Sequence, residues 1–143
     1  MIVLDTTVLV YAVGAEHEFR EPCRSLLAAV GEARIRATTT TQVVQEFAHV
    51  RARRRSRDDA AALATAYIDL LSPLLPTDEA ALRAGLAVFR ERGRLGAFDA
   101  VLGAAATAAG AAAVVSADAA FADLPGVRHV RPDAAGVAAL LRD

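Results

Sequence analysis

Four acidic residues stand where the surrounding pattern places them at strand ends or on helices: Asp5, Glu46, Asp99 and Asp118. Carboxylates packed together without a cation are unfavourable, because each negative charge raises the pKa of its neighbours. A hard divalent cation removes this cost, and Mg²⁺ suits such a cluster better than zinc because it binds few carboxylates and keeps several waters. The ion could activate a bound water and stabilise charge on a phosphodiester. We therefore predict a magnesium site made by these four residues.

Each acidic residue also has a purely structural interpretation. Asp99 could be the N-cap of a helix and Asp118 a turn residue, and for these two the alternatives stay open. Asp5 follows a buried first strand, and Glu46 falls in the apolar stripe of a helix, where an unpaired carboxylate would be costly. The pattern favours a functional role for Asp5 and Glu46.

Short apolar runs predict the strands that position these residues. The runs cover residues 1–4, 34–40, 112–116 and 127–130. Helical patterns lie between them, and an Ala-rich helix follows Gly96. Alternating strands and helices indicate a parallel sheet covered on both faces, with right-handed crossovers. The expected fold is a three-layer α/β/α domain with a central sheet of about four to five strands.

Capping residues and apolar spacing mark the helices more closely. A first helix is expected over about residues 18–30. The N-caps predicted for the following helices are Thr41, Asp58 and either Thr77 or Asp78, and a final helix is expected from Asp133.

Composition excludes several kinds of chemistry. With 143 residues and 55% hydrophobic content, the chain is expected to form a single domain, and a net charge of -1 indicates no general class of partner. All 16 basic residues are Arg, so P-loop and Schiff-base sites that need Lys are excluded. Cys23 is alone, no signal peptide is seen, and residues 97–115 are too rich in Ala and Gly for a membrane helix. A cytoplasmic protein without membrane contact is expected.

Four segments together resemble one known family. They are residues 2–9 (IVLDTTVL), 43–47 (VVQEF), 98–100 (FDA) and 115–118 (VSAD). In this order and spacing they resemble the PIN-domain ribonucleases, and within these the VapC toxins. The resemblance implies an α/β/α domain with the activity of a magnesium- or manganese-dependent endoribonuclease that cuts structured RNA, such as tRNA or rRNA loops.

The resemblance also implies roles for single residues. Asp5 and Asp99 match the principal metal ligands, while Glu46 and Asp118 match the other acidic positions, acting directly or through water. Two hydroxyl residues, Thr6 and Ser116, would orient the neighbouring carboxylates by hydrogen bonds.

Two departures from the family pattern leave part of the mechanism open. Thr7 stands where Ser or Asn is commoner, and Ala120 stands where many relatives have a further acidic residue. One-metal and two-metal mechanisms both remain, as does an alternative in which the chain keeps the fold as an inactive PIN-like domain that binds RNA or protein. A phosphotransfer enzyme is disfavoured, because Thr7 replaces a required Asp and Lys is absent.

Partners follow from the same resemblance. A VapC-type toxin needs a cognate antitoxin, whose inserted Arg would pair with the carboxylates, and relatives form homodimers. The helices around residues 63–71 and 82–89 are candidate interfaces or ordinary core. The candidate RNA contacts are Arg51, Arg53, Arg54 and Arg55, with a solvated helix end as an equal alternative. His17 and His49 are expected to be surface residues without a catalytic role.

Overall fold

The computed structural model describes residues 1–142 and has a parallel sheet at its centre. The strands are β1 (Ile2–Leu4), β2 (Ala37–Thr38), β3 (Ala113–Val115) and β4 (Arg128–Val130), in the order β2-β1-β3-β4. Ile2 lies opposite both Ala37 and Ala113, so β1 pairs with its neighbours on each side. The predicted parallel sheet is confirmed.

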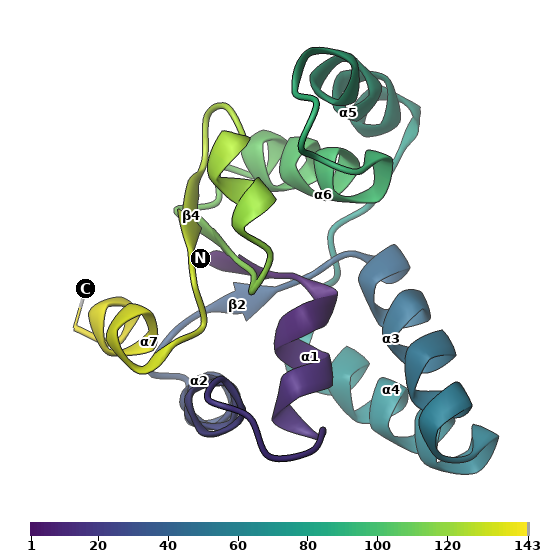
Figure 1. Cartoon of the computed structure of the whole chain (residues 1–143), viewed down its shortest axis with the longest axis vertical. Coiled ribbons are helices and arrows are strands. Elements are labelled where there is room, and N and C mark those ends of the chain that lie inside the picture. Colours follow the sequence, from purple (N-terminus) through teal and green to yellow (C-terminus); the bar gives the residue numbers. More distant parts are fainter. Residues whose placement is uncertain (143) are drawn as a thin grey trace.

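Helices cover this sheet on both faces, which confirms the three-layer α/β/α prediction. Figure 1 shows α5 and α6 above the sheet and α2 and α7 below it, with α3 and α4 projecting as a pair. The helices are α1 (Thr6–Ala12), α2 (Arg20–Gly31), α3 (Thr41–Arg54), α4 (Arg57–Leu71), α5 (Glu79–Glu91), α6 (Ala97–Ala108) and α7 (Ala134–Leu140). A short 3₁₀ helix, η1 (Ala119–Asp123), follows β3.

Two predicted caps were wrong by one and two residues. Thr40, not Thr41, caps α3 by accepting a hydrogen bond from the backbone N–H of Val43. Ser56, not Asp58, caps α4 in the same way, which leaves Asp58 in the first turn. Asp78, one of the two caps predicted for α5, is confirmed, and Asp133, where the final helix was expected to begin, is the N-cap of α7.

The apolar strands β1 and β3 form the middle of the core. All six of their residues are buried, because a parallel strand covered on both faces has no solvent side. Cys23 is part of this core, and burial raises the pKa of its thiol to about 12. The lone cysteine is therefore an inert packing residue, as its isolation in the sequence suggested.

Helix α6, which carries Asp99, is held by close packing against α5. A Cβ added at Gly85 would lie 2.5 Å from the Cα of Val101, so only glycine permits this approach of the two backbones. Helix α6 spans 12 residues. Nowhere in residues 1–142 is there a helix both long and apolar enough to cross a membrane.

Candidate active site

Two of the predicted carboxylates lie at the ends of adjacent parallel strands. Asp5 follows β1, and its backbone N–H donates to the carbonyl of Val115 at 3.0 Å, the last residue of β3. Asp118 follows β3 after two further residues. Because both strands end at the same edge of the sheet, these side chains reach one site, as the topology of parallel sheets predicts.

Hydroxyl groups fix the orientation of the Asp5 carboxylate. Its Oδ2 accepts hydrogen bonds from Thr7 Oγ1 and Ser116 Oγ, both at 2.7 Å, and a longer one from the Thr7 backbone N–H at 3.3 Å. The last of these caps α1. No hydrogen bond from residues 1–142 reaches Oδ1, so this oxygen is available to an external ligand. Asp5 is 5% exposed, and its carboxylate is held rigidly.

Thr7 has a positioning role that the sequence did not reveal. Besides donating to Asp5, its hydroxyl accepts a hydrogen bond from the Ala117 backbone N–H at 3.0 Å. It therefore joins the start of α1 to the segment that leaves β3. The available signal was the family position itself, where a hydroxyl or amide side chain is common.

Glu46 reaches the site from α3 but is not buried. Its Oε2 accepts a hydrogen bond of 2.6 Å from the hydroxyl of buried Thr6. Glu46 is therefore not an unpaired carboxylate enclosed by apolar side chains, because this turn of α3 lines the cleft and the side chain is exposed. Thr6 and Ser116 do orient neighbouring carboxylates, as their proposed roles require.

Asp118 combines a structural and a site position. Its Oδ1 accepts from the Ala120 backbone N–H at 2.8 Å and so caps η1, which confirms the turn interpretation. Its own N–H donates to Ser116 Oγ at 3.0 Å. The side chain is exposed and lines the same cleft as Asp5, so the two interpretations are compatible. Ala120 is buried.

Asp99 lies in the first turn of α6, where Gly96 is the N-cap, so the interpretation of Asp99 as the N-cap was wrong. Burial, and after it the negative charges of Asp5, Asp118 and Glu46 in that order, together raise the pKa of Asp99 to about 6. A hydrogen bond with the Gly96 backbone acts in the opposite direction. The four carboxylates therefore feel one another's charge.

The four carboxylates line one cleft of about 550 Å³, here called the acidic cleft. Over residues 1–142, no three acidic, His or Cys side chains are close enough to hold one metal ion by themselves. An ion bound by one or two carboxylates and several waters needs no such group, and this is the coordination that Mg²⁺ prefers. The donor set, oxygen only and negatively charged, fits that ion.

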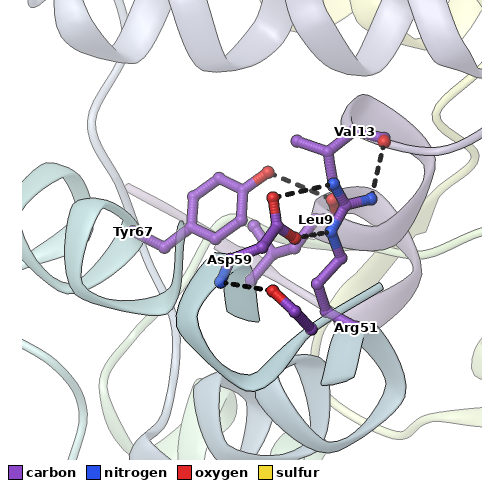
Figure 2. A network of polar contacts seen from close by, with 6 residues as sticks. Leu9, Val13, Arg51, Asp59 and Tyr67 are labelled. Carbon is purple, nitrogen blue, oxygen red and sulfur yellow. Dashed lines mark hydrogen bonds and ion pairs between the residues drawn. The ribbon is translucent and has the colours of Figure 1, made fainter. Parts of the chain in front are cut away.

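The four candidate Arg residues point to different surroundings. Figure 2 shows the Arg51 guanidinium bound by Asp59, with its Nε 2.5 Å from Oδ2, and donating to the Val13 carbonyl at 3.1 Å. Arg54 lines the acidic cleft, while Arg55 lines a neighbouring pocket between α1 and α3. Arg53 is exposed.

A second, mostly apolar groove of about 410 Å³ opens beside the acidic cleft. It shares Asp5, Glu46 and Asp99 with the cleft, and α5 and α6 supply its apolar wall. Leu82, Leu86 and Phe98 lie in this wall and are 45%, 46% and 80% exposed. Side chains of this size usually mark a surface that binds a partner.

The comparison with known proteins agrees with this geometry. A model of the PIN domain family matches residues 2–127. The chain belongs to the PIN domain family. Ribonuclease VapC7 of Mycobacterium tuberculosis (strain ATCC 25618 / H37Rv) is 59% identical over 144 residues, covering 100% of this chain and 99% of the relative. This PIN domain is therefore of the VapC type, as the four sequence segments indicated.

Two solved structures share the fold of this PIN domain at low sequence identity. One is VapBC2 from Rickettsia felis bound to a DNA fragment from their promoter, with a TM-score of 0.70 and 14% identity. The other is FitAcB from Neisseria gonorrhoeae, with a TM-score of 0.71 and 19% identity. Each match covers 92% of this chain and 98% of the other.

Proposed function

We propose that this PIN domain is a magnesium-dependent endoribonuclease and the toxin of a VapBC-type pair, with Mn²⁺ as a substitute ion. The observation that carries the proposal is the acidic cleft, where burial and the three neighbouring carboxylates raise the pKa of Asp99 to about 6. Such a cluster calls for an external cation. The 59% identical relative is named a ribonuclease, which supports RNA as the substrate.

The four carboxylates of the acidic cleft have different proposed roles. Asp5 and Asp99 would hold the ion, and the hydroxyls of Thr7 and Ser116 keep Asp5 in one orientation. When bound, Mg²⁺ supplies a water of lowered pKa and an opposing charge for the phosphodiester. Glu46, fixed at Oε2 by Thr6, and Asp118 would orient the attacking water and hydrated ion from the exposed side.

Arg54 is the Arg that we propose as a contact for the substrate phosphate. It lines the acidic cleft near the carboxylates, whereas the Arg51 guanidinium is bound by Asp59 and the Val13 carbonyl. A guanidinium at the rim can bind a phosphate oxygen bidentately without neutralising the metal site. Of these two arginines, Arg51 thus stabilises the fold and Arg54 is proposed to bind the substrate.

The nuclease proposal is tested by incubating purified protein with a pool of cellular RNA and sequencing the 5′ ends of the fragments. We expect discrete cuts with Mg²⁺ or Mn²⁺, no cuts with EDTA, and no cuts by Asp5→Asn. Asp69→Asn, which changes an exposed carboxylate on α4, is the matched control and should cut normally. Cutting that persists in EDTA would refute the proposal.

An inactive binding domain is the second candidate, and Ala120 motivates it because relatives carry an acidic residue there. Ala120 is a buried residue of η1 and donates its N–H to Asp118, so the position serves the local fold here. If wild-type protein binds RNA but cuts no pool under either metal ion, this candidate replaces the nuclease.

We further propose that the cognate antitoxin occupies the apolar groove beside the acidic cleft. Its exposed Leu82, Leu86 and Phe98 suit an apolar peptide, and the adjoining carboxylates suit an inserted Arg. A Leu82→Glu variant should lose antitoxin binding and keep RNA cleavage. Co-purification with the antitoxin measures the first, and light scattering of the free protein tests the expected homodimer.

A further inference from the structure

Three aromatic rings gather beside the acidic cleft, one from the last turn of α1 and two from the segment between α1 and α2. The ring of Tyr11 lies 4.4 Å from that of His17, centroid to centroid, with 31° between their planes. Phe19 is buried against both, 5.4 Å from Tyr11 and 5.0 Å from His17. Tyr11 and His17 line the cleft that Asp5, Glu46, Asp99 and Asp118 also line.

The position of His17 is fixed although the residue is exposed. Its Nδ1 accepts a hydrogen bond of 3.1 Å from the Phe19 backbone N–H, so in the neutral ring the proton is on Nε2. Phe19 is held from another side by the guanidinium of Arg131, whose carbon lies 5.3 Å from the ring centroid. We call the pair Tyr11 and His17 the aromatic shelf.

The negative charge of the acidic cleft makes an uncharged binding surface useful for RNA. The cleft carries four carboxylates and also Glu16, so an approaching polyphosphate chain is repelled over most of its lining. Arg54 supplies a positive charge in the same lining. Affinity that does not depend on charge is therefore valuable, and stacking of a base on an aromatic ring provides it for any base.

We infer that the aromatic shelf binds one unpaired nucleobase of single-stranded RNA beside the reacting phosphate, with Arg54 contacting the backbone. This inference rests on the proposed function and names the form of its substrate: the RNA must be splayed out at the cut, as in a loop. Bases within a duplex are stacked on their neighbours and cannot occupy the shelf.

The test is a binding measurement with variants in an Asp99→Asn background, which prevents cleavage. The probes are a short single-stranded RNA of random sequence, the same RNA as a duplex, and an abasic ribose-phosphate oligomer of equal length. Tyr11→Leu removes the ring and keeps apolar volume, Tyr11→Phe keeps the ring, and His17→Asn keeps a hydrogen-bond acceptor without the ring. Thermal unfolding of each variant confirms that it folds.

We expect Tyr11→Leu and His17→Asn to bind the single-stranded probe about tenfold more weakly, with Tyr11→Phe unchanged. The abasic oligomer should bind all of these variants equally, because it has no base to stack. Phe89→Leu, at a half-exposed ring that lines neither the cleft nor the groove, is the aromatic control. For Arg54→Ala, which should weaken both probes, the control is Arg53→Ala on the same helix.

Three results would overturn the inference: unchanged affinity in Tyr11→Leu, an equal loss for the abasic oligomer, or equal binding of duplex and single strand. Cleavage by the wild type is assayed in parallel. If the shelf variants bind RNA normally while the wild type cuts in Mg²⁺, the inference about the aromatic shelf is wrong and the proposed nuclease function is retained. If the wild type does not cut but the shelf variants lose affinity for RNA, the proposed nuclease function is wrong and the inference about the aromatic shelf is retained.

Discussion

Carboxylates in two regions of this molecule meet opposite electrostatic surroundings. On the α3–α4 pair, Asp59 accepts hydrogen bonds from Arg51, which lowers its pKa. In the acidic cleft, burial and three neighbouring carboxylates raise the pKa of Asp99 to about 6. A cation thus lies beside the carboxylate of the α3–α4 pair, whereas within residues 1–142 none of the four carboxylates of the acidic cleft forms an ion pair.

This difference separates structural from functional acids more sharply than residue type does. A satisfied ion pair has completed its interactions and gains little from a further ion. Carboxylates without a nearby cation repel one another and so lower the stability of the folded chain. Binding of a cation restores that stability. Replacing Asp by Asn in each of the two regions therefore tests directly which carboxylates serve the fold and which serve the proposed metal site.

The largest effect is expected from Asp99→Asn. Removing one of the charges proposed to hold the ion should lower the cleavage rate by on the order of a thousandfold, because metal stabilisation of the transition state contributes several kcal/mol. The folded protein should be at least as stable as the wild type, since the change relieves repulsion. Cleavage of RNA at saturating Mg²⁺ and thermal unfolding without metal measure the two quantities. Loss of stability together with activity would remove the distinction between the regions.

The next effect is a dependence of stability on pH in metal-free protein. The pKa of Asp99 is higher in the folded chain, about 6, than its usual 3.8, so the folded state binds this proton more tightly. The contribution is complete below about pH 4 and is lost as the pH rises towards 6, by up to about 3 kcal/mol.

Metal should reverse this trend. Binding of Mg²⁺ requires the deprotonated carboxylate, so added Mg²⁺ should stabilise the protein more at about pH 8 than at about pH 5. Denaturant titrations of wild type and Asp99→Asn across this range provide the measurement. A wild type as insensitive to pH and Mg²⁺ as the variant would contradict the electrostatic account.

A smaller effect is expected from Thr7→Val, which keeps the shape of the side chain. Asp5 loses one of its two short hydrogen bonds, and the Ala117 N–H loses its acceptor. We expect about tenfold slower cleavage and a weaker apparent affinity for Mg²⁺, as for other groups that orient metal ligands. Thr65→Val, at an exposed position on α4, is the control. Equal activity of the two variants would show that Thr7 has no positioning role.

The smallest effect on activity is expected from Asp59→Asn. Cleavage should be unchanged, while the midpoint of thermal unfolding should fall by a few degrees at neutral pH. Because the pKa of Asp59 is lowered by Arg51, its stabilising contribution exists above the usual value of 3.8 and is lost as the pH falls through its lowered pKa. The difference between the variant and the wild type should therefore vanish in acid. A large loss of cleavage would make the Arg51–Asp59 ion pair part of the active site.

The sequence predicted the sheet and the four acids because both depend on local pattern. Apolar runs such as residues 113–115 are typical of buried parallel strands, and the ends of such strands share one edge. Helix α1 was missed because its Thr-Thr-Val-Leu-Val segment is rich in β-branched residues and looks like a continued strand. The Asp5 side chain, which accepts the Thr7 N–H, starts the helix instead.

The missed interactions are those that join distant segments. Asp59 follows Arg51 by eight residues across a turn, so no helical spacing predicts their pairing. Glu46 was expected to be buried because its helix has an apolar stripe, but that stripe ends at the rim of the cleft. The shelf depends on a loop geometry that brings His17 against Tyr11, which spacing alone does not give.

Asp5 performs two tasks with one carboxylate: Oδ2 closes the first turn of α1, and Oδ1 is left for an external ligand. Asp5 therefore contributes both to the stability of α1 and to the proposed metal site. Substitution by asparagine separates these two contributions. Asparagine retains an acceptor for the helix terminus while losing the negative charge, whereas alanine loses both. An inactive yet well-folded protein is thus expected from one substitution, which supplies a matched inactive form for every test of the proposed nuclease.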